Sequence, residues 1–118
     1  MREEKKYFEI KKEGNVTIVT LNQAEIINES CIDGFWKQIV ALIKSIPKIK
    51  LVLNLGRVDF LFSFMIEKII SLFQETRIVD GEVKLCEIKG IVSEIIKATK
   101  LNTLFEIYET EQEAIESF

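Results

Sequence analysis

The clearest pattern in the chain is a change of hydrophobic period near its middle. Residues 51–55, with the sequence Leu-Val-Leu-Asn-Leu, are almost wholly apolar and β-favouring, as expected for a strand covered on both faces. After Gly56, apolar residues recur at the three- and four-residue steps that place side chains on one face of a helix. They are Met65, Ile66, Ile69, Ile70 and Phe73. The stretch predicts a buried strand, a short loop and a helix that runs to about Thr76, with Ser63 as its N-cap.

Two segments with alternating or β-branched residues precede this stretch and predict strands at residues 7–12 and 16–21. Only residues 13–15, with the sequence Glu-Gly-Asn, separate them. Because the connection is so short, the two strands are expected to pair as an antiparallel hairpin.

A long amphipathic helix is predicted between the hairpin and the central strand. Ser30 and Asp33 have the spacing of a variant capping box at its start, and Pro47 ends it. Its wide apolar face would consist of Ile32, Phe35, Trp36, Ile39, Leu42, Ile43 and Ile46. A tryptophan in such a face is typical of a core, so we interpret Trp36 as a core anchor rather than as a binding platform.

The last third of the chain continues the alternation of strand and helix. The Asp-Gly dipeptide at 80–81 indicates a turn, residues 83–88 a strand, and Gly90 precedes another helix. Residues 105–108 predict a short final strand. Residues 110–113, Thr-Glu-Gln-Glu, then form a capping box for a closing helix. Its inward-facing side chains would be Ala114, Ile115 and Phe118.

The complete order, ββαβαβαβα, predicts an α/β fold in which a mixed sheet begins with a hairpin and has helices packed against it. The parallel crossovers are expected to be right-handed. The chain has 118 residues, of which 47% are apolar, and it contains no linker, repeat or low-complexity segment. We therefore expect one domain over residues 1–118, with one face of the sheet less covered than in a fully doubly wound fold.

Charge and hydropathy narrow the possible partners. The net charge is -3 and the charges are dispersed, whereas binding to nucleic acid needs a clustered basic surface. Lys44, Lys48 and Lys50 flank a turn, and we interpret them as solvated. The chain begins with charged residues, and no apolar run approaches the roughly eighteen residues of a membrane helix. We expect a cytoplasmic protein with neither nucleic acid nor a membrane as its partner.

Histidine and the glycine-rich loops on which many enzymes and metal or phosphate sites depend are missing. The sequence has no histidine, so it lacks the commonest general base and a common zinc ligand. Its five glycines stand singly, and therefore no phosphate-binding loop can be recognised. Cys31 and Cys86 are isolated, and we interpret both as small buried hydrophobes. The sequence predicts no catalytic residue, no cofactor and no metal, and hence a protein that is not an enzyme.

Residues 51–66 resemble the core of STAS domains, the fold of bacterial anti-sigma factor antagonists. In that family the strand ends in an aspartate or asparagine, an apolar residue and a small residue, which here are Asn54, Leu55 and Gly56. Residues 101–114 begin with Leu-Asn-Thr-Leu-Phe and end with Glu-Ala, which is similar to the family's closing segment. The resemblance covers nearly the whole chain and implies a STAS-like fold.

The resemblance also implies a role for Ser63. In the family, a D-S-[ST]-G-L-type sequence opens the helix, and a partner that is both anti-sigma factor and ATP-dependent serine kinase phosphorylates its serine or threonine. That residue corresponds to Ser63, while Phe62, Phe64 and Met65 replace the aspartate, the small hydroxyl residue and the glycine. The implied function is that of an anti-sigma factor antagonist, a partner-switching regulator. The residues expected to contact the partner are Asp59, Phe62, Ser63, Phe64, Met65 and Glu67.

Other interpretations of the same stretch are compatible with the sequence. Ser63 could serve only as an N-cap. Residues 60–65 are too apolar for alternation to bury all of them, so one or two would form an exposed rim that contacts a protein, unless Phe62 folds back near Trp36. A STAS module without phosphorylation would use Phe62 and Phe64 to dock another protein or to form a weak homodimer. An enzyme or small-ligand carrier would need a deep polar cavity, which the sequence gives no reason to expect.

Overall fold

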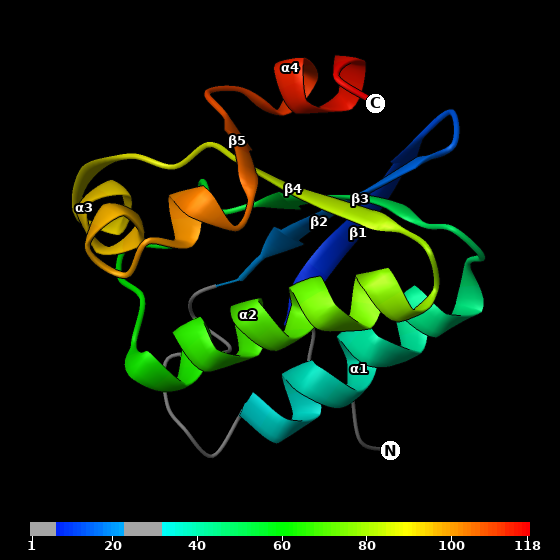
Figure 1. Cartoon of the computed structure of the whole chain (residues 1–118), viewed down its shortest axis with the longest axis horizontal. Helices are drawn as coiled ribbons and strands as arrows, with labels where there is room; N and C mark the ends of the chain where they lie inside the picture. Colours follow the sequence, from blue (N-terminus) through cyan, green and yellow to red (C-terminus); the bar gives the residue numbers. More distant parts are fainter. Residues whose placement is uncertain (1–6, 23–31) are drawn as a thin grey trace, which may run out of the picture.

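The centre of the computed structural model is a five-stranded sheet whose strands stand in chain order, β1-β2-β3-β4-β5 (Figure 1). The structure describes residues 7–22 and 32–118. Its elements are β1 (Phe8–Glu13), β2 (Val16–Leu21), α1 (Ile32–Ser45), β3 (Lys50–Asn54), α2 (Ser63–Ile78), β4 (Glu82–Cys86), α3 (Gly90–Ala98), the 3-10 helix η3 (Leu101–Thr103), β5 (Glu106–Tyr108) and α4 (Glu111–Glu116). This order confirms the predicted ββαβαβαβα fold, with η3 as an addition.

The strand pairing has one antiparallel and three parallel neighbours. β1 and β2 form the predicted hairpin, in which Phe8 lies opposite Leu21 and Glu13 opposite Val16. Gly14 in its turn has a φ of 61°, a conformation that glycine adopts without steric cost. The pairs β2–β3, β3–β4 and β4–β5 are parallel. The carboxyl ends of β2, β3 and β4 therefore lie at one end of the sheet, where the loop to α2 begins.

The helices are distributed unequally over the two faces. Each crossover from β2 onwards moves in the same direction across the sheet, and right-handed crossovers that move in one direction place their helices on one face. The core on that face joins α1, α2 and α3 to the sheet, and its fully buried members include Phe35, Ile39, Leu51, Leu53, Met65, Ile69 and Leu85. This finding matches the expectation that the other face would be less covered.

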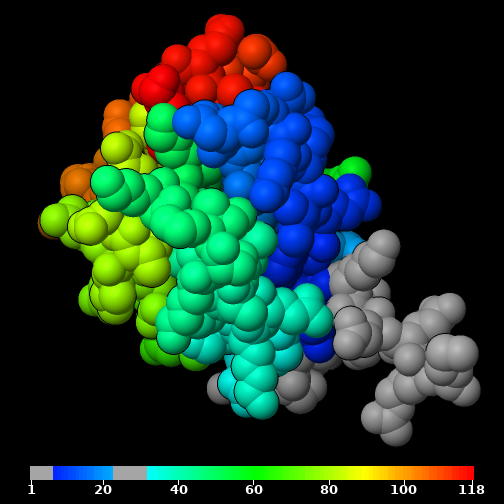
Figure 2. All heavy atoms as spheres, turned by 90° about the vertical axis from the view of Figure 1, so that its right-hand side faces the viewer, coloured from blue at the N-terminus to red at the C-terminus, as the bar shows by residue number. Residues whose placement is uncertain are grey.

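The second face carries a smaller apolar cluster, and α4 is the helix that packs on it. The buried members of this cluster are Val16, Ile18, Val52, Cys86 and Ala114. Figure 1 shows α4 on the opposite side of the sheet from α1 and α2. In the side view of Figure 2, the red C-terminal segment lies against the blue hairpin, at the far end of the molecule from α1. The free thiol of Cys86 is buried under this segment, as predicted.

Several predicted details can be compared with the structure. Trp36 is half-buried and packs on the core, with Lys68 Nζ 5.0 Å from its ring centre. Gly90 is the first residue of α3 rather than the residue before it. The expected capping box at Ser30 and the thiol of Cys31 lie outside the described residues. None of the helices in residues 7–22 and 32–118 combines the length and apolar character that a membrane crossing requires.

Candidate functional site

The loop formed by residues 55–62 connects β3 to α2 and presents side chains to solvent. Val58 and Leu61 hold it against the core, since they are only 6% and 2% exposed. The Val58 N–H donates to the Leu55 carbonyl at 3.0 Å and closes a turn. Asp59 and Phe60 lie between the two anchors and face outward. The loop is therefore fixed by its apolar residues while its intervening side chains stay accessible.

Helix α2 begins one residue earlier than the cap prediction requires. Phe62 occupies the N-cap position with extended dihedrals, φ -76° and ψ 157°, and no side-chain hydrogen bond caps the helix. Its carbonyl accepts the N–H groups of Met65 and Ile66 at 2.9 and 3.0 Å. Ser63 is thus the first helical residue, and its prediction as the N-cap is wrong. Its side chain is exposed, and its hydroxyl has no hydrogen-bond partner among the described residues.

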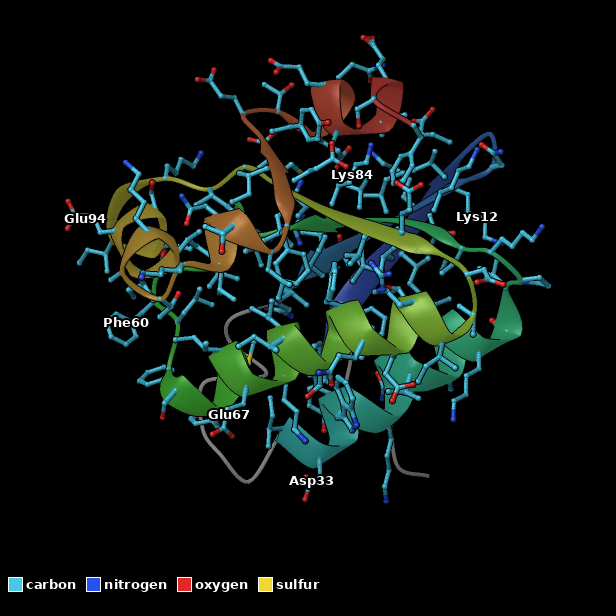
Figure 3. All side chains as sticks on the ribbon, viewed as in Figure 1. Lys12, Asp33, Phe60, Glu67, Lys84 and Glu94 are labelled. Atoms are coloured by element: carbon cyan, nitrogen blue, oxygen red, sulfur yellow. The ribbon has the colours of Figure 1, made fainter. Side chains whose placement is uncertain are left out.

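Three phenylalanines near Ser63 in the chain form what we call the aromatic row: Phe60, Phe62 and Phe64. The Phe62 ring is stacked on that of Phe64, with centroids 5.6 Å apart and an interplanar angle of 4°. The Phe60 and Phe62 centroids are 5.0 Å apart. Phe60 and Phe62 are 43% and 37% exposed, whereas Phe64 is half-buried against the core. Figure 3 shows Phe60 pointing outward beside the N-terminal end of α2.

The structure separates the predicted contact residues into two groups. Asp59, Phe62, Ser63 and Glu67 are exposed, and Phe64 is half-buried at the same end of the molecule. Met65 is only 1% exposed because it begins the buried stripe of α2, so its assignment to the contact surface is wrong. The expected exposed rim exists, and its members are Phe60 and Phe62. Phe60 is absent from the predicted contacts, although its alternation with buried Leu61 could have indicated it.

The helix end at Ser63 favours added negative charge. The first turn of α2 contains no acidic residue, and its free N–H groups give this end of the helix a partial positive charge. A phosphate on Ser63 would be stabilised by that charge. Glu67 lies four positions further on and therefore on the same side of the helix, where it would oppose the phosphate. The site can thus hold a phosphoryl group, with one carboxylate next to it.

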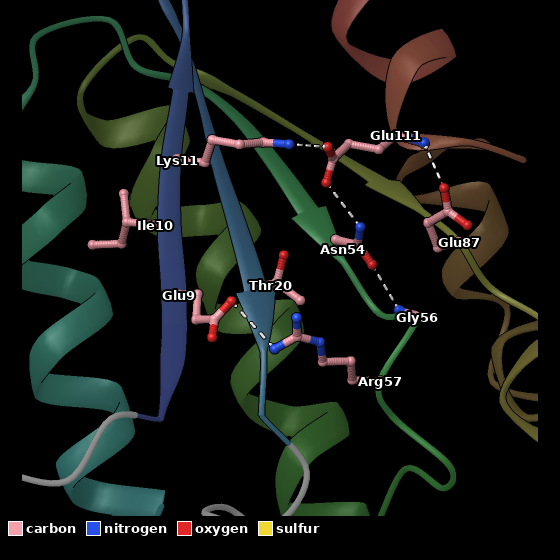
Figure 4. A pocket seen from close by; sticks show the side chains of 9 residues that line it. All are labelled: Glu9, Ile10, Lys11, Thr20, Asn54, Gly56, Arg57, Glu87 and Glu111. Carbon is pink, nitrogen blue, oxygen red and sulfur yellow. Dashed lines mark hydrogen bonds and ion pairs between the residues drawn. The ribbon is translucent and has the colours of Figure 1, made fainter.

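A second polar group of side chains lies at the other face of the sheet, and we call it the Glu111 cluster: Lys11, Asn54, Glu87 and Glu111 (Figure 4). The Glu111 carboxylate accepts from Lys11 Nζ at 2.6 Å and from Asn54 Nδ2 at 2.9 Å. The Glu111 N–H donates to the Glu87 carboxylate at 2.8 Å. Asn54 Oδ1 also accepts the N–H of Gly56 at 2.7 Å. The cluster joins the start of α4 to β1, to the end of β3 and to the start of the loop at 55–62.

The pKa values in this cluster reflect the pairing of Lys11 with Glu111. Partial burial would raise the pKa of Glu111, but hydrogen bonds from Lys11 and Asn54 and the charge of Lys11 together lower it below its ordinary value. The hydrogen bond to Glu111, aided by its charge, raises the pKa of Lys11. Both shifts favour the charged pair. This cluster was not predicted from the sequence. The polar Asn54 at the end of an apolar strand was the one feature that could have indicated it.

A cavity of about 380 Å³ lies beside the cluster and opens along the sheet face. Two ion pairs lie beside it, Lys11 with Glu111 and Arg57 with Glu9 at 3.2 Å, and the Glu87 carboxylate accepts the Glu111 N–H. Burial, followed by the charges of Glu111 and Glu87, raises the pKa of the Cys86 thiol to about 12. Within residues 7–22 and 32–118, no group of three or more metal-ligating side chains occurs. The polar groups at this cavity thus contact one another across β1, β3, the loop at 55–62 and the start of α4.

The chain matches one family model and several solved structures. The family model described as the STAS domain matches residues 7–114. Comparison with the curated proteins gives no match. Among solved structures, an anti-sigma-factor antagonist (STAS) domain protein from Planctomyces limnophilus is 20% identical with a TM-score of 0.82, and 93% of this chain and 96% of that chain are covered. An anti-sigma factor antagonist from Mycobacterium paratuberculosis is also 20% identical, with a TM-score of 0.80 and coverage of 93% and 91%.

SpoIIAA, an anti-sigma factor antagonist, is similar in fold in two states. Its unphosphorylated form is 17% identical to this chain with a TM-score of 0.74, and 93% of this chain and 94% of that chain are covered. The phosphorylated form of the Bacillus protein is 16% identical with a TM-score of 0.66 and coverage of 93% and 97%. At these identities the structural matches establish the fold, and the family model establishes the family: the chain belongs to the STAS domain family.

Proposed function

We propose that the protein is an anti-sigma factor antagonist that binds an anti-sigma factor with serine kinase activity, and that phosphorylation of Ser63 ends the contact. The observation that carries the proposal is the position of Ser63. Ser63 is exposed and is the first residue of α2, and it lies in the chain between the stacked Phe62 and Phe64. Membership of the STAS family and the fold shared with anti-sigma factor antagonists support it. The proposal implies that the protein acts in the cytoplasm.

The proposed switch follows from the surroundings of Ser63. Exposed Phe60 and Phe62 would be buried against the partner and would supply apolar contact area. A phosphate on Ser63 would bring about two negative charges into this apolar contact at neutral pH. The helix end stabilises that charge in the free protein, whereas the complex would have to bury it beside Glu67. Phosphorylation would therefore weaken the complex more than it weakens the fold.

Phosphorylation itself can be tested with the cognate anti-sigma kinase and ATP, followed by intact mass measurement. Wild-type protein should gain the mass of one phosphate, and Ser63→Ala should gain none. Ser71→Ala, with a serine removed from the same helix, serves as the matched control and should gain one phosphate like the wild type. If no phosphate is added to the wild type, or if it is added to Ser63→Ala, the proposed switch is wrong.

Binding can be tested in the same series by titrating the unphosphorylated proteins with the anti-sigma factor. Ser63→Asp should raise Kd about tenfold or more, which corresponds to about 1.4 kcal/mol. Gln74→Asp adds the same charge to an exposed position further along α2 and should leave Kd unchanged. Equal affinities of Ser63→Asp and Gln74→Asp would remove Ser63 from the contact surface.

A second candidate function is a STAS module that docks constitutively, without phosphorylation, or that self-associates as a weak homodimer. The stacked and exposed rings of the aromatic row are the observation that favours it. Sedimentation of the wild type and of Phe62→Asp separates the two forms of this candidate. A wild-type dimer that becomes a monomer in Phe62→Asp supports self-association, and monomers in both cases argue against it.

A further inference from the structure

Helix α4 buries fewer of its own residues than the longer helices do. Its only buried residue is Ala114, whereas α1 and α2 each bury four residues. Ile115 and Phe118 add partly buried area against the second face of the sheet. The helix has six residues, which is too short for helical structure to persist in water without tertiary contacts. Its place on the sheet therefore depends on tertiary contacts, which are this apolar cluster and the polar contacts at its two ends.

The first polar anchor of α4 is the Glu111 cluster at its N-terminal end. Glu111 supplies three contacts, since its carboxylate binds Lys11 and Asn54 and its N–H binds Glu87. These partners come from β1, from the end of β3 and from the segment after β4. Figure 4 shows the three partners on different segments, each linked to the first residue of the helix.

The second polar anchor is Lys84, which lies between the sheet and the C-terminal end of α4 (Figure 3). It is 4% exposed, although it is charged. Its Nζ donates to the carbonyl of Ser117 at 3.1 Å and to the Ser117 hydroxyl at 2.9 Å. The same nitrogen lies 4.3 Å from the ring centre of Phe118 and 3.7 Å from the Glu106 carboxylate. All of these acceptors are near the surface, so water could replace them if α4 moved away.

We propose that α4 is a latch, which opens as a unit while the sheet and α1–α3 stay folded and is held shut by Glu111 and Lys84. Opening would uncover Cys86 and the apolar strip formed by Val16, Ile18 and Val52. Elements with few buried apolar contacts are the ones that open locally at a free energy below that of global unfolding. The proposal does not depend on a partner at Ser63.

The latch is also connected to the loop that presents Ser63. Asn54 donates to Glu111 on α4, and its Oδ1 accepts the N–H of Gly56 at the start of the loop. When α4 opens, the amide of Asn54 loses the acceptor that fixes its orientation. One side chain therefore contacts both the latch and the first residues of the loop at 55–62.

Cys86 provides a direct readout of the latch, because its side chain is 0% exposed beneath α4. The experiment uses the full chain with Cys31→Ser, so that Cys86 is the only remaining thiol. The rate of alkylation by N-ethylmaleimide at constant pH is followed by intact mass, in zero to low urea. Glu111→Gln and Lys84→Met each remove one anchor. Glu113→Gln removes the same charge from an exposed position in the same helix and is the matched control.

If α4 is a latch, Glu111→Gln and Lys84→Met should each speed alkylation about tenfold relative to Glu113→Gln, because each removes hydrogen bonds to a charged group. The rate in wild type and variants should depend less on urea than global unfolding does, since local opening exposes less surface than unfolding of the whole chain. Amide exchange should likewise be faster in residues 111–118 than in β3. A rate with the urea dependence of global unfolding, equal rates in the three variants, or equal exchange in α4 and β3 would overturn the proposal.

Discussion

Phe62 and Met65 lie three positions apart, and their surroundings give them opposite roles. The Phe62 ring stacks on Phe64 and keeps 37% of its surface exposed. Met65 is 1% exposed and continues into the buried stripe of α2 with Ile69 and Leu72. The two side chains therefore differ in what their loss would cost the fold.

At this scale we expect Met65→Ala to lower the free energy of unfolding by about 2–5 kcal/mol, because a buried side chain leaves a cavity that the core fills only in part. Phe62→Ala should cost less than about 1.5 kcal/mol, since it loses ring contacts at the surface. Urea unfolding of both variants gives the comparison. Equal losses would show that the aromatic row is part of the core.

Of the features near Ser63, the inward position of Met65 could be predicted from the sequence, whereas the N-cap of α2 could not. The helical step correctly put Met65 on the inward face of α2, and that placement already conflicted with its assignment to the partner surface. The N-cap prediction failed because the extended residue before the helix is Phe62. This residue has a ring stacked on Phe64 and no side-chain oxygen that could cap the helix. Ring stacking of this kind has no sequence signal comparable to that of a serine or threonine cap.

At the scale of elements, the turn between α2 and β4 needs a glycine at position 81, because no side chain would fit there. The Asp-Gly dipeptide predicted this turn, but the residue with positive φ is Asp80, at 57°, and not Gly81. A Cβ on Gly81 would lie 2.6 Å from the backbone oxygen of Ile49. That oxygen accepts the N–H of Glu82 at 2.9 Å at the start of β4. The glycine allows the two segments to approach closely enough for this hydrogen bond.

We therefore expect Gly81→Ala to destabilise the protein by about 1–3 kcal/mol, because the backbone of β4 must shift to relieve the clash. Glu82→Ala, at the exposed neighbouring position, is the control and should change stability by less than about 0.5 kcal/mol. Thermal and urea unfolding of both variants measure the difference. Similar stabilities of Gly81→Ala and Glu82→Ala would contradict the close approach at this turn.

For the whole molecule, the element order could be predicted from hydrophobic periods, because each element's buried face repeats within a few residues. The Glu111 cluster could not be predicted in this way. Its contacts join residues 100 and 57 positions apart, and their geometry depends on the completed sheet. The same holds for Lys84, a buried lysine between the apolar Val83 and Leu85 of β4, which binds Ser117 at the end of α4. Long-range polar contacts of this kind leave no periodic trace in the sequence.

The Lys11–Glu111 pair gives the whole molecule a pH dependence with a defined sign. The pKa of Glu111 is lowered in the folded state, so its stabilisation is present above the ordinary value of 4.5 and is lost as the pH falls through the folded value. The pKa of Lys11 is raised, so its stabilisation is present below the ordinary value of 10.5 and is lost at higher pH. Asn54 and Glu87 are the other groups that face Glu111.

The expected result is that Glu111→Gln unfolds at lower urea than the wild type at pH 7, and that the difference shrinks as the pH falls towards 2.5. Urea midpoints of the two proteins across this range provide the measurement. Glu113→Gln, compared in the same way, corrects for loss of charge from α4. A difference that stays constant down to pH 2.5 would contradict the role assigned to the charged pair.

The order of the strands has a consequence for how the chain folds. Every strand pairs with its neighbours in the chain, so the sheet can grow from the β1–β2 hairpin by adding one strand at a time. Contacts between distant residues form late, because closing a long loop costs entropy before the contact is gained. The Lys11–Glu111 pair spans 100 positions and would form after the sheet is complete. Its contribution would therefore slow unfolding and leave the folding rate nearly unchanged.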